Sequence, residues 1–123
     1  MVFNMRNLDP EDSITCVYTM LKSVALGTMS GKVILIDSET GAVLRTYEPH
    51  RSKVTMVYLK EDVAVISSSV EGKVTINFND EDLDTINISL NQDDLTCFCT
   101  KGTFNPSKIE FFYGTRQGKL RFF

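Results

Sequence analysis

Residues able to do chemistry are few in this chain, and their spacing argues against most reactions. The single histidine, His50, has no G-x-S-x-G segment or other nucleophile motif beside it. Asp80, Asp82 and Asp84 are spaced like the first ligands of an EF-hand loop, but the sixth and twelfth positions lack the required glycine and glutamate. We therefore expect a structural or exposed histidine, a solvated acidic turn, and a protein that is not an enzyme.

The cysteines do not form a metal-binding or disulfide pattern. Cys97 and Cys99 are two residues apart, which places both on one face of a strand, and Cys16 lies far from them in sequence. Zinc sites usually combine two closely spaced pairs of ligands, and the chain has no second pair. A P-loop and a dinucleotide-binding glycine fingerprint are also missing from the sequence. We expect buried, reduced thiols and no metal or cofactor.

A short segment of glycine, lysine and a run of apolar residues occurs three times. The glycines are 41 and 46 residues apart. A period of about 40–45 residues that contains several short strands is typical of the blades of a WD-type β-propeller. The three pairs that begin the runs are Gly31 and Lys32, Gly72 and Lys73, and Gly118 and Lys119.

The segments around these pairs predict strands. Each repeat begins with an apolar residue, a threonine and a β-prone run, followed by a second strand that ends in small residues. Apolar residues alternate in Ile86, Ile88 and Leu90, which favours a half-buried strand over a helix. The prediction is an all-β fold, a partial WD-type propeller with about two complete four-stranded blades and most of a third. Residues 1–12 form an N-terminal extension, and the blades cover about 13–50, 51–91 and 92–123.

Closed propellers typically have about four to eight blades, so three cannot complete a ring. We expect this chain to be part of a longer protein or to need a partner. The third repeat is longer than the others because of residues 100–108, whose glycine, asparagine and proline predict a surface loop. Such a loop can carry contacts, although an insertion without function is the simpler explanation.

Two sets of polar residues are candidates for a role in the folded propeller. His50 stands where many WD repeats carry a structural histidine, and Ser67 or Ser68 and Glu71 can complete its hydrogen-bond network. Lys32, Lys73 and Lys119 recur at the start of the third strands, and together with Arg116 they form a basic arc. It can face an acidic partner or an anionic lipid, or it can simply protect exposed strand ends from aggregation.

Composition narrows the possible partners. The chain has 123 residues, of which 42% are hydrophobic and 24% charged, and its net charge is −3. A folded domain fits these values, whereas general binding of nucleic acid needs clustered positive charge. No run is long and apolar enough for a signal peptide or a transmembrane segment, so we expect a cytoplasmic protein.

Val24–Asp37 resembles the first-blade segment of the vacuolar protein sorting-associated protein 41 family, a subunit of the HOPS tethering complex. Ser69–Val74 is similar to that family's next blade, and the resemblance extends over residues 14–123. It implies a protein-interaction propeller that acts in vesicle transport to late endosomes, lysosomes or vacuoles. The implied partners are other tethering-complex subunits and a late-endosomal Rab GTPase or adaptor, with at most peripheral membrane association.

Other interpretations remain open at this point. Related tethering subunits, including the CORVET-specific one, begin with similar propellers. A generic WD-like scaffold outside vesicle transport is a second interpretation, since a fold does not determine a function. An enzymatic propeller would need metal ligands that converge on a central channel, and the sequence offers one histidine and scattered carboxylates.

Overall fold

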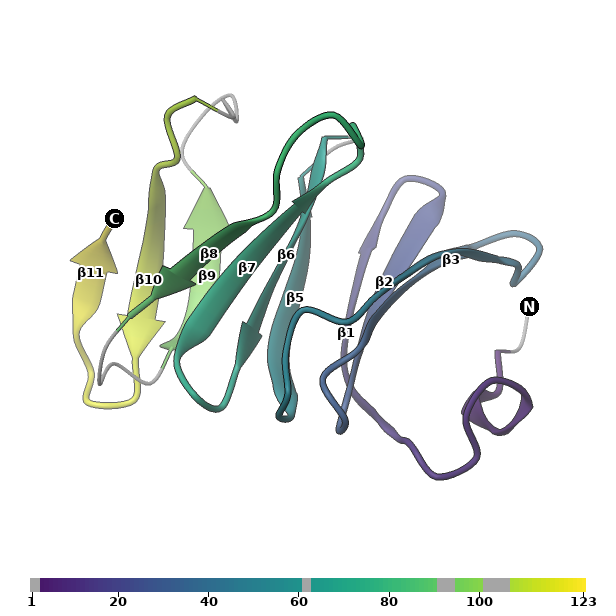
Figure 1. Cartoon of the computed structure of the whole chain (residues 1–123). Helices are drawn as coiled ribbons and strands as arrows, with labels where there is room; N and C mark the ends of the chain where they lie inside the picture. Colours follow the sequence, from purple (N-terminus) through teal and green to yellow (C-terminus); the bar gives the residue numbers. More distant parts are fainter. Residues whose placement is uncertain (1–2, 61–62, 91–94, 101–106) are drawn as a thin grey trace.

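The computed structural model describes residues 3–60, 63–90, 95–100 and 107–123. Within these ranges the chain forms three antiparallel sheets and one short 3-10 helix, η1 (Met5–Asn7), and no α-helix. The expected all-β fold is confirmed. Figure 1 shows the sheets one after another in chain order, with η1 beside the first sheet and the last strand at the other end of the row.

Each sheet is a meander in which consecutive strands pair, as expected when short turns join antiparallel strands. Blade 1 contains β1 (Ile14–Met20), β2 (Ser23–Thr28), β3 (Val33–Asp37) and β4 (Val43–Tyr47). Blade 2 contains β5 (Val54–Lys60), β6 (Ala64–Ser69), β7 (Lys73–Phe78) and β8 (Ile86–Ser89). Blade 3 contains β9 (Leu95–Thr100), β10 (Phe111–Thr115) and β11 (Leu120–Phe122).

Of the alternating apolar residues, Ile86 and Ile88 lie in β8, and Leu90 follows directly after its last residue, Ser89. Most of the long loop expected at 100–108 lies outside the described residues. Residues 3–12 lie outside the strands of blade 1.

Burial follows the position of a strand within its blade. All six residues of β6 are buried, and so are the first four of β3, because these strands have a neighbouring strand on both sides and a neighbouring sheet on at least one face. Strand β4 forms the outer edge of blade 1 and is mostly exposed. Branched apolar residues dominate the central strands, where they pack well on a pleated surface.

The blades are held together by contacts between their faces. We call the face that points to the next blade in the chain the forward face, and the opposite one the rear face. Ala25, Val33 and Leu35 on the forward face of blade 1 pack against a rear face of blade 2 that includes Val57 and Val65. Burial of these apolar side chains is the main source of cohesion between sheets.

The next interface repeats this arrangement. Ile66, Val74 and Ile76 on the forward face of blade 2 pack against Phe111 and Tyr113 of blade 3. A row of aromatic rings also crosses the three blades. Its centroid distances are 4.8 Å for Tyr18–Tyr58, 5.6 Å for Tyr58–Phe98 and 4.6 Å for Phe98–Phe111. Such contacts stabilise the stack beyond the area that they bury.

The N-terminal segment covers part of the rear face of blade 1. Met5 of η1 is buried and packs in one cluster with Leu26, Ile34 and Ile36. Asp12 accepts a hydrogen bond of 3.1 Å from the backbone of Ser30, which joins the segment to the turn between β2 and β3. The expected extension is thus packed onto the first blade along most of its described length.

Candidate interaction surfaces

The three glycine–lysine pairs lie in one kind of turn, which joins the second and third strands of each blade. We call these the Gly–Lys turns. The glycine N–H donates to the carbonyl three residues earlier, at 3.3, 3.0 and 3.0 Å in blades 1 to 3. Gly31, Gly72 and Gly118 have φ of 102°, 76° and 83°, where a side chain is strained. In Figure 1 all three turns lie at the lower end of the blades.

A hydroxyl residue four positions before each lysine contributes to these turns. Lys32 N donates to Thr28 Oγ1 at 3.0 Å, and Lys119 N donates to Thr115 Oγ1 at 3.1 Å. Ser69 holds the same position in blade 2, where its hydroxyl is buried without a hydrogen-bond partner among the described residues. Sequence reasoning missed this feature, although the recurring Ser or Thr four residues before Lys was a usable signal.

The connections between blades run across the Gly–Lys turns. His50 N donates to the carbonyl of Gly31 at 3.3 Å, and Leu90 N donates to the carbonyl of Gly72 at 3.0 Å. A Cβ atom on Gly31 would collide with the carbonyl group of His50. The first turn therefore needs glycine both for its backbone angle and for the close approach of this connection.

His50 is buried, and its Nε2 lies 2.9 Å from Ser67 Oγ. Glu71 does not complete the expected network, because it is exposed and His50 Nδ1 has no hydrogen-bond partner among the described residues. Burial, and then the nearby charge of Lys73, lowers the pKa of His50 to about 4. A neutral histidine enclosed by the fold is suited to a structural role and has no access to a substrate.

The predicted basic arc divides into residues with different surroundings. Lys32 is half-buried and forms an ion pair with Asp9, with Nζ and Oδ2 3.4 Å apart. Lys73 Nζ donates to the carbonyl of Pro49 at 2.9 Å, next to His50. Arg116 and Lys119 are exposed on the turn of blade 3. Lys32 and Lys73 therefore hold parts of this chain together.

The tips of the Gly–Lys turns carry a second set of side chains at one repeated position. Met29 and Val70 are both about half exposed (50% and 51%), and Arg116 is exposed at the corresponding place in blade 3. We call these three residues the rim row. They project from rigid turns at one end of the blades, which gives a partner an ordered surface of two apolar side chains and one cation.

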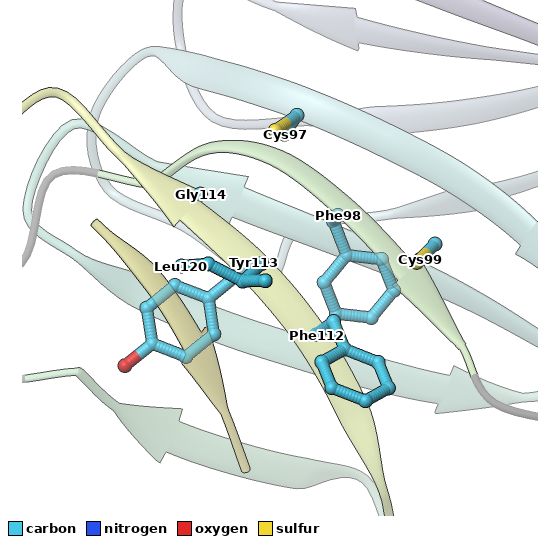
Figure 2. A pocket seen from close by; sticks show the side chains of 7 residues that line it. All are labelled: Cys97, Phe98, Cys99, Phe112, Tyr113, Gly114 and Leu120. Atoms are coloured by element: carbon cyan, nitrogen blue, oxygen red, sulfur yellow. The ribbon is translucent and has the colours of Figure 1, made fainter. Parts of the chain in front are cut away.

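An apolar cavity of about 240 Å³ opens on blade 3. Figure 2 shows that its lining comes from all three strands of this blade, and the residues are Cys97, Phe98, Cys99, Phe112, Tyr113, Gly114 and Leu120. The expectation that all cysteines are buried is wrong for Cys97 and Cys99, which are exposed free thiols. Cys16 is partly covered by blade 2, and this burial raises its pKa.

The acidic residues with EF-hand-like spacing lie in a surface turn. Asp80, Asp82 and Asp84 are exposed, and Asp80 Oδ1 accepts a hydrogen bond of 3.0 Å from Asp82 N within its own turn. Among the residues placed in the structure, no three His, Cys, Asp or Glu side chains gather closely enough to bind a metal ion. In the same residues, no helix has the length and apolar character needed to cross a membrane.

Comparison with solved structures identifies the architecture. A chain of the mitotic checkpoint complex matches 94% of this chain over 36% of its own length, with 14% identity and a TM-score of 0.74. Saccharomyces cerevisiae Sqt1 matches 90% of this chain over 31% of its own, with 16% identity and a TM-score of 0.68. Both are WD-type β-propeller proteins. The fold is a partial WD-type β-propeller.

The designed protein Ika4 is also similar, with 16% identity and a TM-score of 0.58. The match covers 92% of this chain and 91% of the designed one. This chain thus spans about a third of the length of the two natural propellers and nearly all of the designed protein. No protein-family model and no curated protein matches the sequence.

Proposed function

We propose that this chain is a protein-interaction segment that binds partner proteins through its rim row. Met29 and Val70 carry the proposal, because they are apolar, half exposed and held at the same position of two turns of the same kind. Each turn is closed by a backbone hydrogen bond and rests on buried central strands. A rigid surface loses little conformational entropy on binding, which favours affinity.

The partner that we propose is a component of a HOPS-type tethering complex or a late-endosomal Rab GTPase or adaptor. The support is the resemblance of Val24–Asp37 and Ser69–Val74 to the vacuolar protein sorting-associated protein 41 family. In this proposal the protein is cytoplasmic and associates peripherally with late endosomes, lysosomes or vacuoles. Met29 and Val70 of the rim row lie within these two segments.

A pull-down with the purified chain tests both parts of the proposal. The candidate Rab GTPase is loaded with a GTP analogue or with GDP, and purified tethering subunits are tested separately. We expect binding to one of these partners and a loss of about tenfold or more in affinity when Met29→Asp and Val70→Asp are combined. Binding by the GTP form alone would support a Rab effector role.

Leu83→Asp is the matched control, because Leu83 is also partly exposed but lies in the loop between β7 and β8, at the other end of blade 2. This variant is expected to bind like the wild type. Equal weakening by both sets of substitutions would contradict the rim surface. Absence of every tethering subunit and of the Rab GTPase would contradict the tethering role and leave a generic scaffold as the better interpretation.

A further inference from the structure

The forward face of blade 3 is exposed, whereas another blade covers the forward faces of blades 1 and 2. Leu120 occupies the place that Val33 holds in blade 1 and Val74 in blade 2, as its position directly after the lysine of the turn shows. Both valines are 0% exposed, whereas Leu120 is 78% exposed. The covered counterparts contact the rear face of the following blade. The forward face of blade 3 therefore exposes the positions that, in blades 1 and 2, pack against the rear face of the next blade.

The cavity of blade 3 lies on this face. Cys97, Cys99 and Phe112 line it, and Phe122 is also exposed, although its counterparts Leu35 and Ile76 are buried. Strand pairing places Phe112 opposite Cys99 and Phe122, so these side chains share one side of the sheet. The result is a continuous apolar surface with the same strand geometry as the two established interfaces.

The chain itself carries a rear face whose inner part is uncovered. Ile14 and Val17 on β1 are 44% and 60% exposed. Their counterparts in blade 2, Val54 and Val57, are 0% and 4% exposed because blade 1 covers them. The N-terminal segment packs on β2 and β3 of the rear face, where Val24, the counterpart of Val65, is partly buried, and it leaves Ile14 and Val17 of β1 exposed. One chain therefore exposes both halves of a blade-to-blade interface.

One threonine forms a hydrogen bond across the first blade interface, whereas the equivalent Thr55 pairs with Ser68 Oγ of its own blade at 2.8 Å. In the interface between blades 1 and 2, Thr15 Oγ1 donates to the carbonyl of Val54 at 2.6 Å. Thr96 holds the place of Thr15 in blade 3 and is exposed, and Ile14 holds the place of Val54 in blade 1. A second chain that docks like a following blade would bring its Ile14 carbonyl to Thr96.

We infer that two copies of this chain pair head to tail, with the forward face of blade 3 in each copy docked on the inner rear face of blade 1 in the other. Two such contacts close a ring of six blades, which is within the usual range of about four to eight. A contact between two different surfaces gives a closed ring only when the rotations from one chain to the next add up to a full turn. Otherwise it gives an open fibre. Pairing does not depend on which partner the rim row binds.

Sedimentation and light scattering of the purified chain test this pairing. We expect a species with twice the mass of one chain. Val17→Asp and Leu120→Asp, on opposite faces of the contact, are each expected to weaken it at least tenfold, because each buries an unpaired charge. Val43→Asp is the control, since Val43 is similarly exposed but lies on the outer strand β4.

Mixing the two interface variants tests the head-to-tail arrangement. The Val17→Asp chain keeps an intact forward face and the Leu120→Asp chain keeps an intact rear face, so a mixture is expected to form a heterodimer through one contact. A dimer through a single self-complementary surface would not be rescued in this way. A monomeric wild type, a dimer insensitive to both variants, or an absence of rescue would overturn the inference.

Thiol labelling gives a second measurement on the wild-type chain. Cys97 and Cys99 would be covered in the dimer and are exposed in the single chain, whereas Cys16 lies inside blade 1 next to blade 2 in both states. We expect labelling of Cys97 and Cys99 to slow at least several-fold as protein concentration rises, while labelling of Cys16 stays constant. Concentration-independent labelling of all three thiols would overturn the pairing.

Discussion

At the scale of residues, the same motif serves different purposes in different blades. Gly31 lies under the carbonyl group of His50, so that a Cβ atom would have no room, while nothing lies within 4 Å of a Cβ on Gly118. Both glycines have positive φ. Both turns need glycine for its positive φ. Gly31 is also required because the connection at His50 passes too close for a side chain.

This difference predicts unequal effects of two identical substitutions. Gly118→Ala introduces only the strain of a left-handed backbone and should lower the free energy of unfolding by about 1–2 kcal/mol. Gly31→Ala adds a collision with the connection at His50 and should lower it by roughly 3 kcal/mol or more. Urea denaturation of both variants measures this difference. Equal losses would mean that the connection at His50 can move aside without lowering the free energy of unfolding.

The buried histidine predicts a dependence of stability on pH. Because the pKa of His50 is lowered to about 4 in the folded chain, the unfolded chain binds a proton there more readily, near pH 6.5. The contribution of neutral His50 is complete above about pH 6.5 and is lost as the pH falls toward 4, by up to about 3 kcal/mol. Lowering the pH across this range should therefore reduce the free energy of unfolding.

His50→Gln provides the control, since glutamine cannot titrate and can still form a hydrogen bond with Ser67. Denaturation at several pH values should show a shallower decline for this variant than for the wild type. Carboxylates contribute equally to both proteins, so the difference between the two curves reports on His50. Parallel curves would contradict a lowered pKa of this histidine.

At the scale of elements, short segments outside the sheets complete the faces of the blades. The segment around η1 packs on Leu26, Ile34 and Ile36 of blade 1. In blade 2, the connection that carries His50 covers Ser67, the counterpart of Leu26. The covering is apolar in the first case and polar in the second, and each matches the side chains beneath it.

Truncation of Met5 should lower the stability of the chain, because it removes the apolar contact between η1 and blade 1. Met5→Ala should lower the free energy of unfolding by roughly 2 kcal/mol, because the methionine side chain is buried. Leu8→Ala, three residues later at an exposed position, should change it by no more than about 0.5 kcal/mol. Thermal unfolding of both variants measures the effect. Equal stability of the two would show that η1 does not stabilise blade 1.

At the scale of the whole molecule, protection decreases from the central blade to the end of the row. All of β6 is buried by neighbours on both sides, and all of β11 is exposed. Blade 2 is also the only one of the three with another blade against both of its faces, as Figure 1 shows for the described residues. Local opening should therefore need the least free energy in blade 3.

Hydrogen exchange tests this order. Amides of β6 and β7 should exchange most slowly and those of β10 and β11 most rapidly, by at least tenfold, in dilute protein. Exchange in β9 to β11 should slow at concentrations where the chain pairs. Uniform exchange rates in all three blades at low concentration would contradict the difference in stability.

The sequence was most informative where one residue type meets a backbone requirement. Glycines at a regular period predicted the turns, and alternation predicted β8, because both depend on local geometry. Side-chain partners were harder to predict. Glu71 belongs to the right turn but points to solvent, and Lys73 contacts Pro49 through a connection whose path is not encoded locally. Cys97 and Cys99 were misjudged because their burial depends on a neighbouring sheet.

The chain contains no tryptophan, although WD repeats usually carry one at the end of the third strand. Ile36, Asn77 and Phe123 replace it at the ends of the three third strands. Ile36 is buried under the N-terminal segment, Asn77 is half-buried and Phe123 is exposed while its ring stacks on Phe111 at 5.0 Å. Each replacement suits different surroundings, and those surroundings come from elements far away in sequence. A repeat consensus therefore could not predict them.

The position of Met5 has a consequence for the order in which the protein is made. Residues 3–9 leave the ribosome before blade 1, so the outer part of its rear face can be sealed during synthesis, before blade 2 has emerged. Most contacts within a blade are between adjacent hairpin strands, which form quickly. Synthesis can thus add one finished sheet at a time to a first sheet whose rear face is already partly covered.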